Sequence, residues 1–191
     1  TANRSELNPN KHVVARASYP VQIKNQVIEA GVQAYKGQFT LLSTTSGVGT
    51  ATDKLYDDER IGATFVLYPK PFGILAEYNI GRGPEYDKLT NSIIESPLKG
   101  GFITASYKLD FKGQTLIPFS RYQYYDGGKK HELDARSYEV KELEIGAEWQ
   151  PNKNFELVVM YTMSARRFED AANPTNFQRG NLLRIQAQVN F

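Results

Sequence analysis

The sequence predicts an all-β fold, a transmembrane antiparallel up-and-down β-barrel. Three observations predict it: about nine segments alternate apolar and polar residues, helical periodicity is almost absent, and short connections alternate with long ones. The closing segment, 182–191, alternates most clearly, because successive side chains of a strand leave opposite faces of the pleat. One face carries Leu183, Ile185, Ala187, Val189 and Phe191, and the other carries Leu182, Arg184, Gln186, Gln188 and Asn190.

The composition predicts one folded domain over residues 1–191. With 40% hydrophobic and 12% aromatic residues and a net charge of +2, the chain is too apolar for a disordered segment and too nearly neutral to indicate a nucleic-acid partner. It has no cysteine, which excludes disulfides and thiolate metal ligands. No stretch approaches the roughly 18 apolar residues of a membrane-spanning helix, but short alternating barrel strands do not need one.

Four strands are expected in the first part of the chain. Segment 12–23 places Val13, Ala15 and Ala17 on one face, and a tight turn at Lys24 leads into segment 26–39. A loop rich in Ser, Thr and Gly is expected at 40–59. It is followed by a strand at about 60–68, a rigid turn at 69–71, a strand at 72–80 and a long connection at 82–98.

Five strands are expected in the remainder. They lie at about 102–109, 115–125, 140–150, 155–166 and 182–191, joined by short turns at 110–113 and 151–154 and by loops at 126–137 and 169–179. Pro118 cannot donate to a strand ladder, so we expect a bulge or local irregularity there.

The connections favour a membrane barrel over a soluble sheet. Soluble sandwiches mix connection lengths irregularly, whereas outer-membrane barrels have short turns on the periplasmic side and long loops outside. The expected connections alternate in this way along the whole chain, and the C-terminus then lies at the periplasmic rim.

Aromatic residues on the apolar face point the same way. Amphipathic rings settle at the headgroup level of a membrane, and ordinary core aromatics are the alternative interpretation. The membrane-interface candidates, all at the turn-side ends of their strands, are Phe72, Trp149, Phe155 and Phe191.

An odd number of strands leaves an open edge, which lipid does not tolerate. We therefore expect the domain to be incomplete at its N-terminus and to form the C-terminal part of a larger barrel. The alternative is that one segment is not a strand, which leaves a closed barrel of eight.

Three stretches near the C-terminus resemble the phosphate-selective porin O and P family. They are RYQYYDGGKK at 121–130, ELEIGAEWQPNKNFELVVMYTMSARR at 142–167 and GNLLRIQAQVNF at 180–191. The resemblance implies a trimeric outer-membrane porin of roughly sixteen strands in a Gram-negative bacterium, with a water-filled channel. It also implies insertion by the barrel assembly machinery, which reads an aromatic C-terminus such as Phe191, and contact with the lipid bilayer and lipopolysaccharide.

In that family an arginine ladder and a constriction loop select anions such as phosphate, and the constriction loop lies in the N-terminal half. If the polar faces line a channel, the bases form an anion path, because the planar fork of Arg donates two hydrogen bonds to phosphate. A wall of mutually neutralising Arg and Glu that only holds the barrel open is the alternative. The basic candidates are Arg16, Lys108, Arg121, Arg166 and Arg184, and the acidic ones are Glu29, Glu77, Glu144, Glu148 and Glu156.

The sequence favours no enzyme, cofactor or metal site. His12 and His131 are far apart and no cysteine accompanies them, so no metal-ligand spacing exists. No nucleophile motif of a serine hydrolase is present. Passive diffusion of small solutes is thus the first hypothesis. A soluble ligand-binding β-barrel and a structural envelope barrel that binds a partner are the alternatives.

Overall fold

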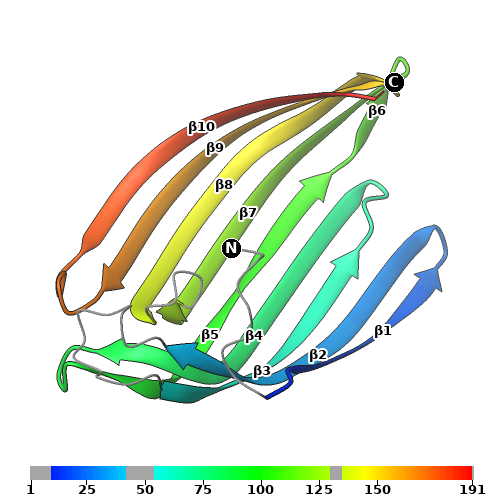
Figure 1. Ribbon diagram of the computed structural model, residues 1–191. Helices are drawn as coiled ribbons and strands as arrows, with labels where there is room; N and C mark the ends of the chain where they lie inside the picture. The colour runs from blue at the N-terminus through cyan, green and yellow to red at the C-terminus, as the bar shows by residue number, and fades with distance from the viewer. Residues whose placement is uncertain (1–9, 42–53, 130–134, 191) are drawn as a thin grey trace.

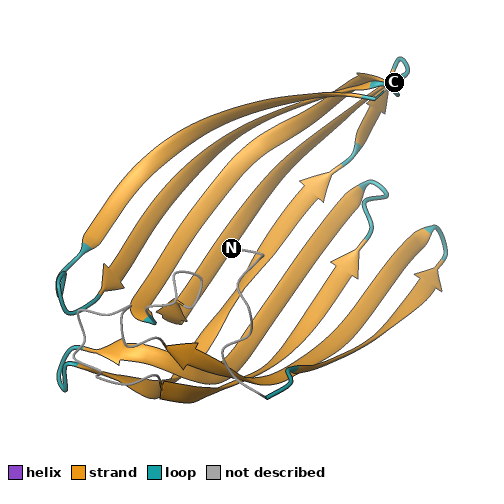
Figure 2. Cartoon of the chain, in the orientation of Figure 1, coloured by secondary structure: helices purple, strands orange, loops and turns teal. Residues whose placement is uncertain are grey.

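The computed structural model describes residues 10–41, 54–129 and 135–190, and it consists of one antiparallel sheet (Figures 1 and 2). Among these residues, no helix is long and apolar enough to cross a membrane. The strands are β1 (Val13–Ile23), β2 (Gln26–Leu41), β3 (Lys54–Leu67), β4 (Phe72–Asp87), β5 (Ser92–Tyr107), β6 (Leu109–Phe111), β7 (Gln114–Lys129), β8 (Arg136–Asn152), β9 (Phe155–Glu169) and β10 (Phe177–Val189).

Each long strand pairs with its neighbours in sequence, which confirms the expected up-and-down order. The order is β1-β2-β3-β4-β5-β7-β8-β9-β10, and the three-residue β6 pairs with β7 beyond the end of β5. β1 and β10 form the two edges of the described sheet, so the sheet is open, as in part of a barrel. Nine long strands are present as expected, and β6 is an addition.

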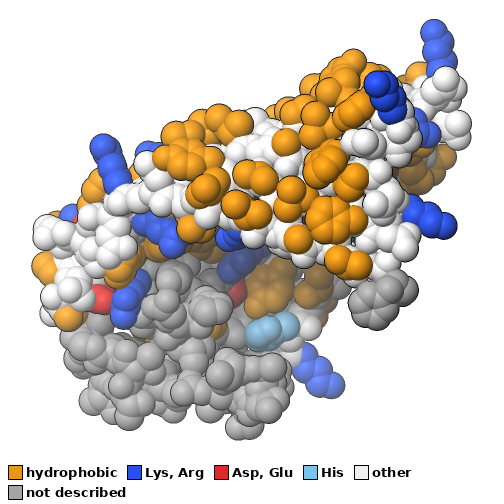
Figure 3. Space-filling view, turned by 90° about the horizontal axis from the view of Figure 1, so that it is seen from above, with side chains coloured by type: hydrophobic (Ala, Val, Ile, Leu, Met, Phe, Trp, Pro, Cys, Tyr) orange, Lys and Arg blue, Asp and Glu red, His pale blue; other side chains and the backbone are white. Residues whose placement is uncertain are grey.

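The strand register puts apolar side chains of neighbouring strands on one face. Ile61 lies opposite Ile80, and Ile145 lies opposite Tyr161. These side chains are exposed rather than packed in a dry interior: Ile145 is 52% exposed and Ile185 is 65% exposed. Figure 3 shows hydrophobic side chains gathered on the outer surface of the curved sheet, with Lys and Arg at its borders. An apolar surface of this extent requires a partner or a lipid environment.

The prediction of a long connection at 82–98 is wrong. β4 continues to Asp87 and β5 begins at Ser92, so a four-residue turn replaces a long loop. The stretch Gly81-Arg82-Gly83-Pro84 predicts that the strand ends here. However, Pro84 in β4 and Pro97 in β5 each lie where one edge of the strand has no pairing partner. Pro84 lies past the last β3–β4 pair, Glu59 with Arg82, and Pro97 lies before the first β5–β7 pair, Lys99 with Asp126. Neither proline therefore needs to donate a backbone hydrogen bond to a neighbouring strand on that edge.

Other boundaries also differ from the expectation. Residues 54–59, expected in a loop, belong to β3, and the connection between β9 and β10 is shorter than expected. The strict alternation of short and long connections therefore does not hold. The irregularity expected at Pro118 is present: β8 pairs with it, but the pairing with β5 ends at Phe119 and that with β6 begins at Leu116.

At the end of the sheet opposite the turns at Lys24 and 69–71, the β4–β5 hairpin packs against the ends of other strands. The amide of Tyr86 donates to the carbonyl of Ala135 at 2.7 Å. Around this contact lies a small core of buried side chains, with Phe39 and Ala171 packed against it. Its buried members are Leu41, Tyr56, Tyr86, Ile93 and Ala135.

Candidate functional site

The concave face of the sheet carries linked polar side chains. Gln33 on β2 donates from Nε2 to Glu77 Oε1 at 3.2 Å and to Asn79 Oδ1 at 3.1 Å, both on β4. Asn79 in turn donates to Glu77 Oε1 at 2.7 Å. These side chains meet across β3 because Gly62 lies between them. A Cβ at this position would come within 2.0 Å of Asn79 Oδ1, so only glycine leaves room for the bridge.

A second polar group runs across β7, β8 and β9 and centres on Glu142. Its carboxylate accepts from Arg166 Nη2 at 2.7 Å, Ser164 Oγ at 2.8 Å and Gln123 Nε2 at 3.4 Å. Arg121 donates to Gln123 Oε1 at 3.0 Å, and its guanidinium lies 4.4 Å from the ring centre of Phe102. One guanidinium group thus binds the Glu142 carboxylate directly, and a second is linked to it through Gln123.

Both polar groups line one open cavity of about 830 Å³. Residues from β1 to β9 line it, which shows that the polar face is the hollow side of the curved sheet. Arg60 and Asp58 of β3 also line it, 3.4 Å apart between Nε and Oδ1. The cavity wall therefore combines guanidinium groups, carboxylates and amides.

The structure brings only some of the sequence-predicted residues to this cavity. Glu77 and Arg166 line it, and Arg121 reaches it through Gln123. Arg16 and Glu29 form an ion pair at 3.9 Å on the same face of β1 and β2. Lys108 lies at the turn end and pairs with Asp110 at 3.1 Å.

The remaining predicted residues lie on the polar face of β8, β9 and β10, outside the cavity. Glu144 accepts from Thr162 at 3.5 Å, and Glu148 accepts from Gln150. Arg184 lies opposite Met160 and Glu156 lies opposite Gln188 in the strand register. The lining roles of all these residues stay predictions.

Several residues that take part in the site were not predicted from the sequence. Glu142 and Gln123 stand two positions from the predicted Glu144 and Arg121, so strand parity alone could have found them. Gln33 and Asn79 are uncharged and lacked a charge signal, and Arg60 stands at a strand boundary that was placed too late in the chain.

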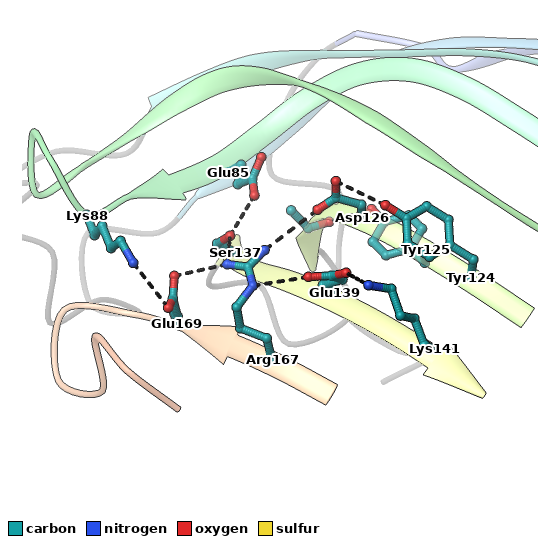
Figure 4. A network of polar contacts seen from close by, with 11 residues as sticks. Glu85, Lys88, Tyr124, Tyr125, Asp126, Ser137, Glu139, Lys141, Arg167 and Glu169 are labelled. Carbon is teal, nitrogen blue, oxygen red and sulfur yellow. Dashed lines mark hydrogen bonds and ion pairs between the residues drawn. The ribbon is translucent and has the colours of Figure 1, made fainter. Parts of the chain in front are cut away.

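A separate ionic cluster holds the outer ends of β4, β8 and β9 together (Figure 4). Arg167 Nη1 donates to Glu169 Oε2 at 3.0 Å and to Ser137 Oγ at 3.2 Å, and its Nε donates to Glu139 at 3.4 Å. Ser137 donates to Glu85 at 2.7 Å. Lys88, in the turn of the β4–β5 hairpin, pairs with Glu169 at 3.4 Å.

The tip of the β4–β5 hairpin is organised by Asp87. Its carboxylate accepts from the hydroxyl of Thr90 at 2.7 Å and from the amide of Leu89 at 3.2 Å. These hydrogen bonds favour the ionised carboxylate and hold the pKa of Asp87 below its usual value. The turn therefore presents a fixed negative charge at its tip.

Three of the four predicted interface aromatics lie at the turn ends of their strands. Phe72 is opposite Tyr107, and Trp149 donates from Nε1 to Gln114 Oε1 at 2.9 Å. Phe155 begins β9 directly after the turn, and Phe191 lies outside the described residues. In the part of the chain that the structure describes, no three His, Asp or Glu side chains gather as a metal site.

A family model described as phosphate-selective porin O and P matches residues 1–191, the whole chain. No curated protein and no solved structure matches the chain.

Proposed function

Since the chain belongs to the phosphate-selective porin O and P family, we propose that it forms a wall of an outer-membrane channel for the passive diffusion of small anions such as phosphate. The family is one of channels rather than enzymes. The observation that carries the proposal is the contrast between the two faces of one sheet. Apolar side chains cover the outside, and a polar cavity lined by Arg60 and Arg166, with Arg121 held beside it by Gln123, lies on the inside.

The arginines suit this role because they are fixed in place. Arg166 is held by Glu142 and Ser164, and Arg121 is held by Gln123 and the ring of Phe102. A fixed guanidinium presents its remaining N–H groups to a passing anion without first losing side-chain freedom. The carboxylates beside the arginines weaken the local positive potential, so the expected preference is for anions in general, with modest strength.

The open edges at β1 and β10 bear on the assembly. Unpaired strand edges are not stable in lipid, so we propose that further strands complete a barrel of roughly sixteen, the size that leaves an aqueous channel. Residence in the bacterial outer membrane, a trimer, insertion by the barrel assembly machinery and contact with lipopolysaccharide follow from the family as parts of the same proposal.

The alternative is a wall whose charges only neutralise each other. It is favoured by the ion pairs of Arg16 with Glu29, Arg60 with Asp58 and Arg166 with Glu142. In that case the channel would conduct ions with no preference for their sign.

The test is the reversal potential of the full-length protein in planar bilayers under a potassium chloride gradient. Replacing Arg121→Glu together with Arg166→Glu should move the reversal potential toward that of a cation-preferring channel. Arg179→Glu on the outer face of β10 makes a charge reversal off the path and should leave the potential unchanged. An unchanged potential in the double variant would exclude both side chains from the conduction path.

A further inference from the structure

A row of charged residues crosses the outer face of the sheet from β2 to β9. Each member lies opposite the next in the strand register, except that Arg82 and Lys99 are offset by two positions. On the turn side of this row, the same face is apolar: Ala34 lies opposite Ile61, and Ile61 lies opposite Ile80. The charged row consists of Lys36, Glu59, Arg82, Lys99, Asp126, Glu139 and Arg167.

Part of the row lies near an expected membrane surface. Strand β8 has 17 residues, whereas about 9–11 residues of a tilted strand cross a bilayer. The outer ends of such strands must therefore extend beyond the hydrocarbon. Barrel strands tilt by about 35–45°, so a row that follows the register runs obliquely to the membrane plane. The part of the row beside the exposed apolar side chains adjoins the face that a bilayer would cover.

An open groove of about 820 Å³ crosses the charged row and extends from β1 to Asp126 of β7. Its apolar part is formed by Val13, which lies opposite Lys36, and by side chains on the turn side of the row, namely Ala15, Ala34, Ile61 and Ile80. Ile61 and Ile80 are 58% and 51% exposed, so apolar surface is available to an acyl chain.

Charged side chains line the other part of the groove. Lys36, Arg82 and Lys99 are accompanied there by Arg60 and by the carboxylates of Glu59 and Asp126. The side chain of Lys36 is 76% exposed and lies 3.9 Å from Glu59, and that of Arg82 is 61% exposed and lies 3.3 Å from Glu95. Exposed ion pairs of this kind contribute little stability. A phosphate group can therefore share or replace the carboxylate partner at small cost.

We propose that this groove binds a phosphate-bearing lipid, with an acyl chain along the apolar part and the phosphate held by Lys36, Arg82 and Lys99. The lipid occupies the outer wall of the barrel, separate from the polar cavity on the inside. The inference rests on the proposed function only in requiring that the apolar face lies in a bilayer.

The test is titration of the full-length protein, purified in detergent, with three probes under native mass spectrometry. Phosphatidylglycerol should bind at least tenfold more tightly than diacylglycerol, which lacks the phosphate. Inorganic phosphate, which lacks the acyl chains, should not displace the lipid. Equal binding of the two lipids, or displacement by inorganic phosphate, would overturn the proposal.

Variants locate the binding. The triple change Lys36→Gln, Arg82→Gln and Lys99→Gln should weaken phosphatidylglycerol about fivefold for each charge removed. The matched triple Lys70→Gln, Lys112→Gln and Lys153→Gln, at the opposite rim, should not weaken it. Unchanged affinity in the groove triple, or a loss of subunit association instead, would contradict a lipid site.

Shape is tested separately from charge. Ala34→Phe fills the apolar part of the groove and should weaken phosphatidylglycerol severalfold, whereas Ala187→Phe, at an exposed alanine of β10, should not. Single-channel conductance should stay at the unmodified value in every groove variant. Loss of lipid binding with normal conductance therefore tests the groove alone. Loss of conductance tests the proposed channel function instead.

Discussion

The two ends of the strands are built in different ways. Toward the tight turns, the outward positions are apolar or aromatic and remain exposed, as Trp149 at 38% and Phe72 at 45% illustrate. Toward the other end, Tyr86 and Ile93 are 5% and 7% exposed, and they pack in the small core with Leu41. The ionic cluster around Arg167 lies beside this core.

The difference indicates which surroundings each end of the strands is suited to. At the turn end the protein supplies only an apolar surface, and lipid must complete the burial. At the outer end the β4–β5 hairpin covers the neighbouring strand ends, so protein side chains rather than lipid bury the apolar groups. The ion pairs at this end are suited to contact with water. The lipid-facing part of the fold should therefore respond to the membrane, and the outer part should respond to core packing.

The largest expected effect comes from the outer core. Tyr86→Ala removes a buried aromatic side chain, a change that costs about 3–5 kcal/mol in a packed core. The cost should appear as faster amide hydrogen exchange in residues 83–98, because the hairpin can detach from β8 while the rest of the sheet stays paired. Tyr19→Ala, at a 75% exposed position of β1, should leave hairpin exchange unchanged. Equal exchange in both variants would argue against a hairpin held by this core.

A smaller effect is expected on the lipid-facing side. Ile145→Arg places a charge in the apolar band, which costs about 2–4 kcal/mol near the bilayer midplane. Glu148→Arg, on the polar face of the same strand, should cost much less because the side chain faces water. Urea unfolding from lipid vesicles measures both. A cost for Glu148→Arg as large as that for Ile145→Arg would mean that the faces are assigned the wrong way round.

The same division explains how much of the fold could be predicted. On the turn side, the period-two pattern is intact, so strand faces and tight turns such as that at Lys24 were predicted correctly. At the outer end, Gly83, Pro84 and Pro97 gave loop signals inside paired strands. A single sequence cannot show that a proline lies at an unpaired edge, because pairing between strands is a tertiary property.

The candidate site was predictable in part for a related reason. Alternation alone put Arg121 and Arg166 on the polar face. The pairing of Arg166 with Glu142, and the link from Arg121 to Glu142 through Gln123, depend on the register of β7, β8 and β9. The Gln33–Asn79 bridge depends on the space left by Gly62, which no charge pattern indicates.

The orientation of the two faces can be measured directly, because the chain has no cysteine. A spin label at Ile145→Cys or at the adjacent Glu144→Cys, in the full-length protein in vesicles, reports the solvent at each position. Ile145→Cys should be accessible to oxygen, which concentrates in lipid, and Glu144→Cys to a water-soluble nickel complex. The reverse pattern, with water at Ile145 and lipid at Glu144, would contradict a channel wall with its apolar face outward.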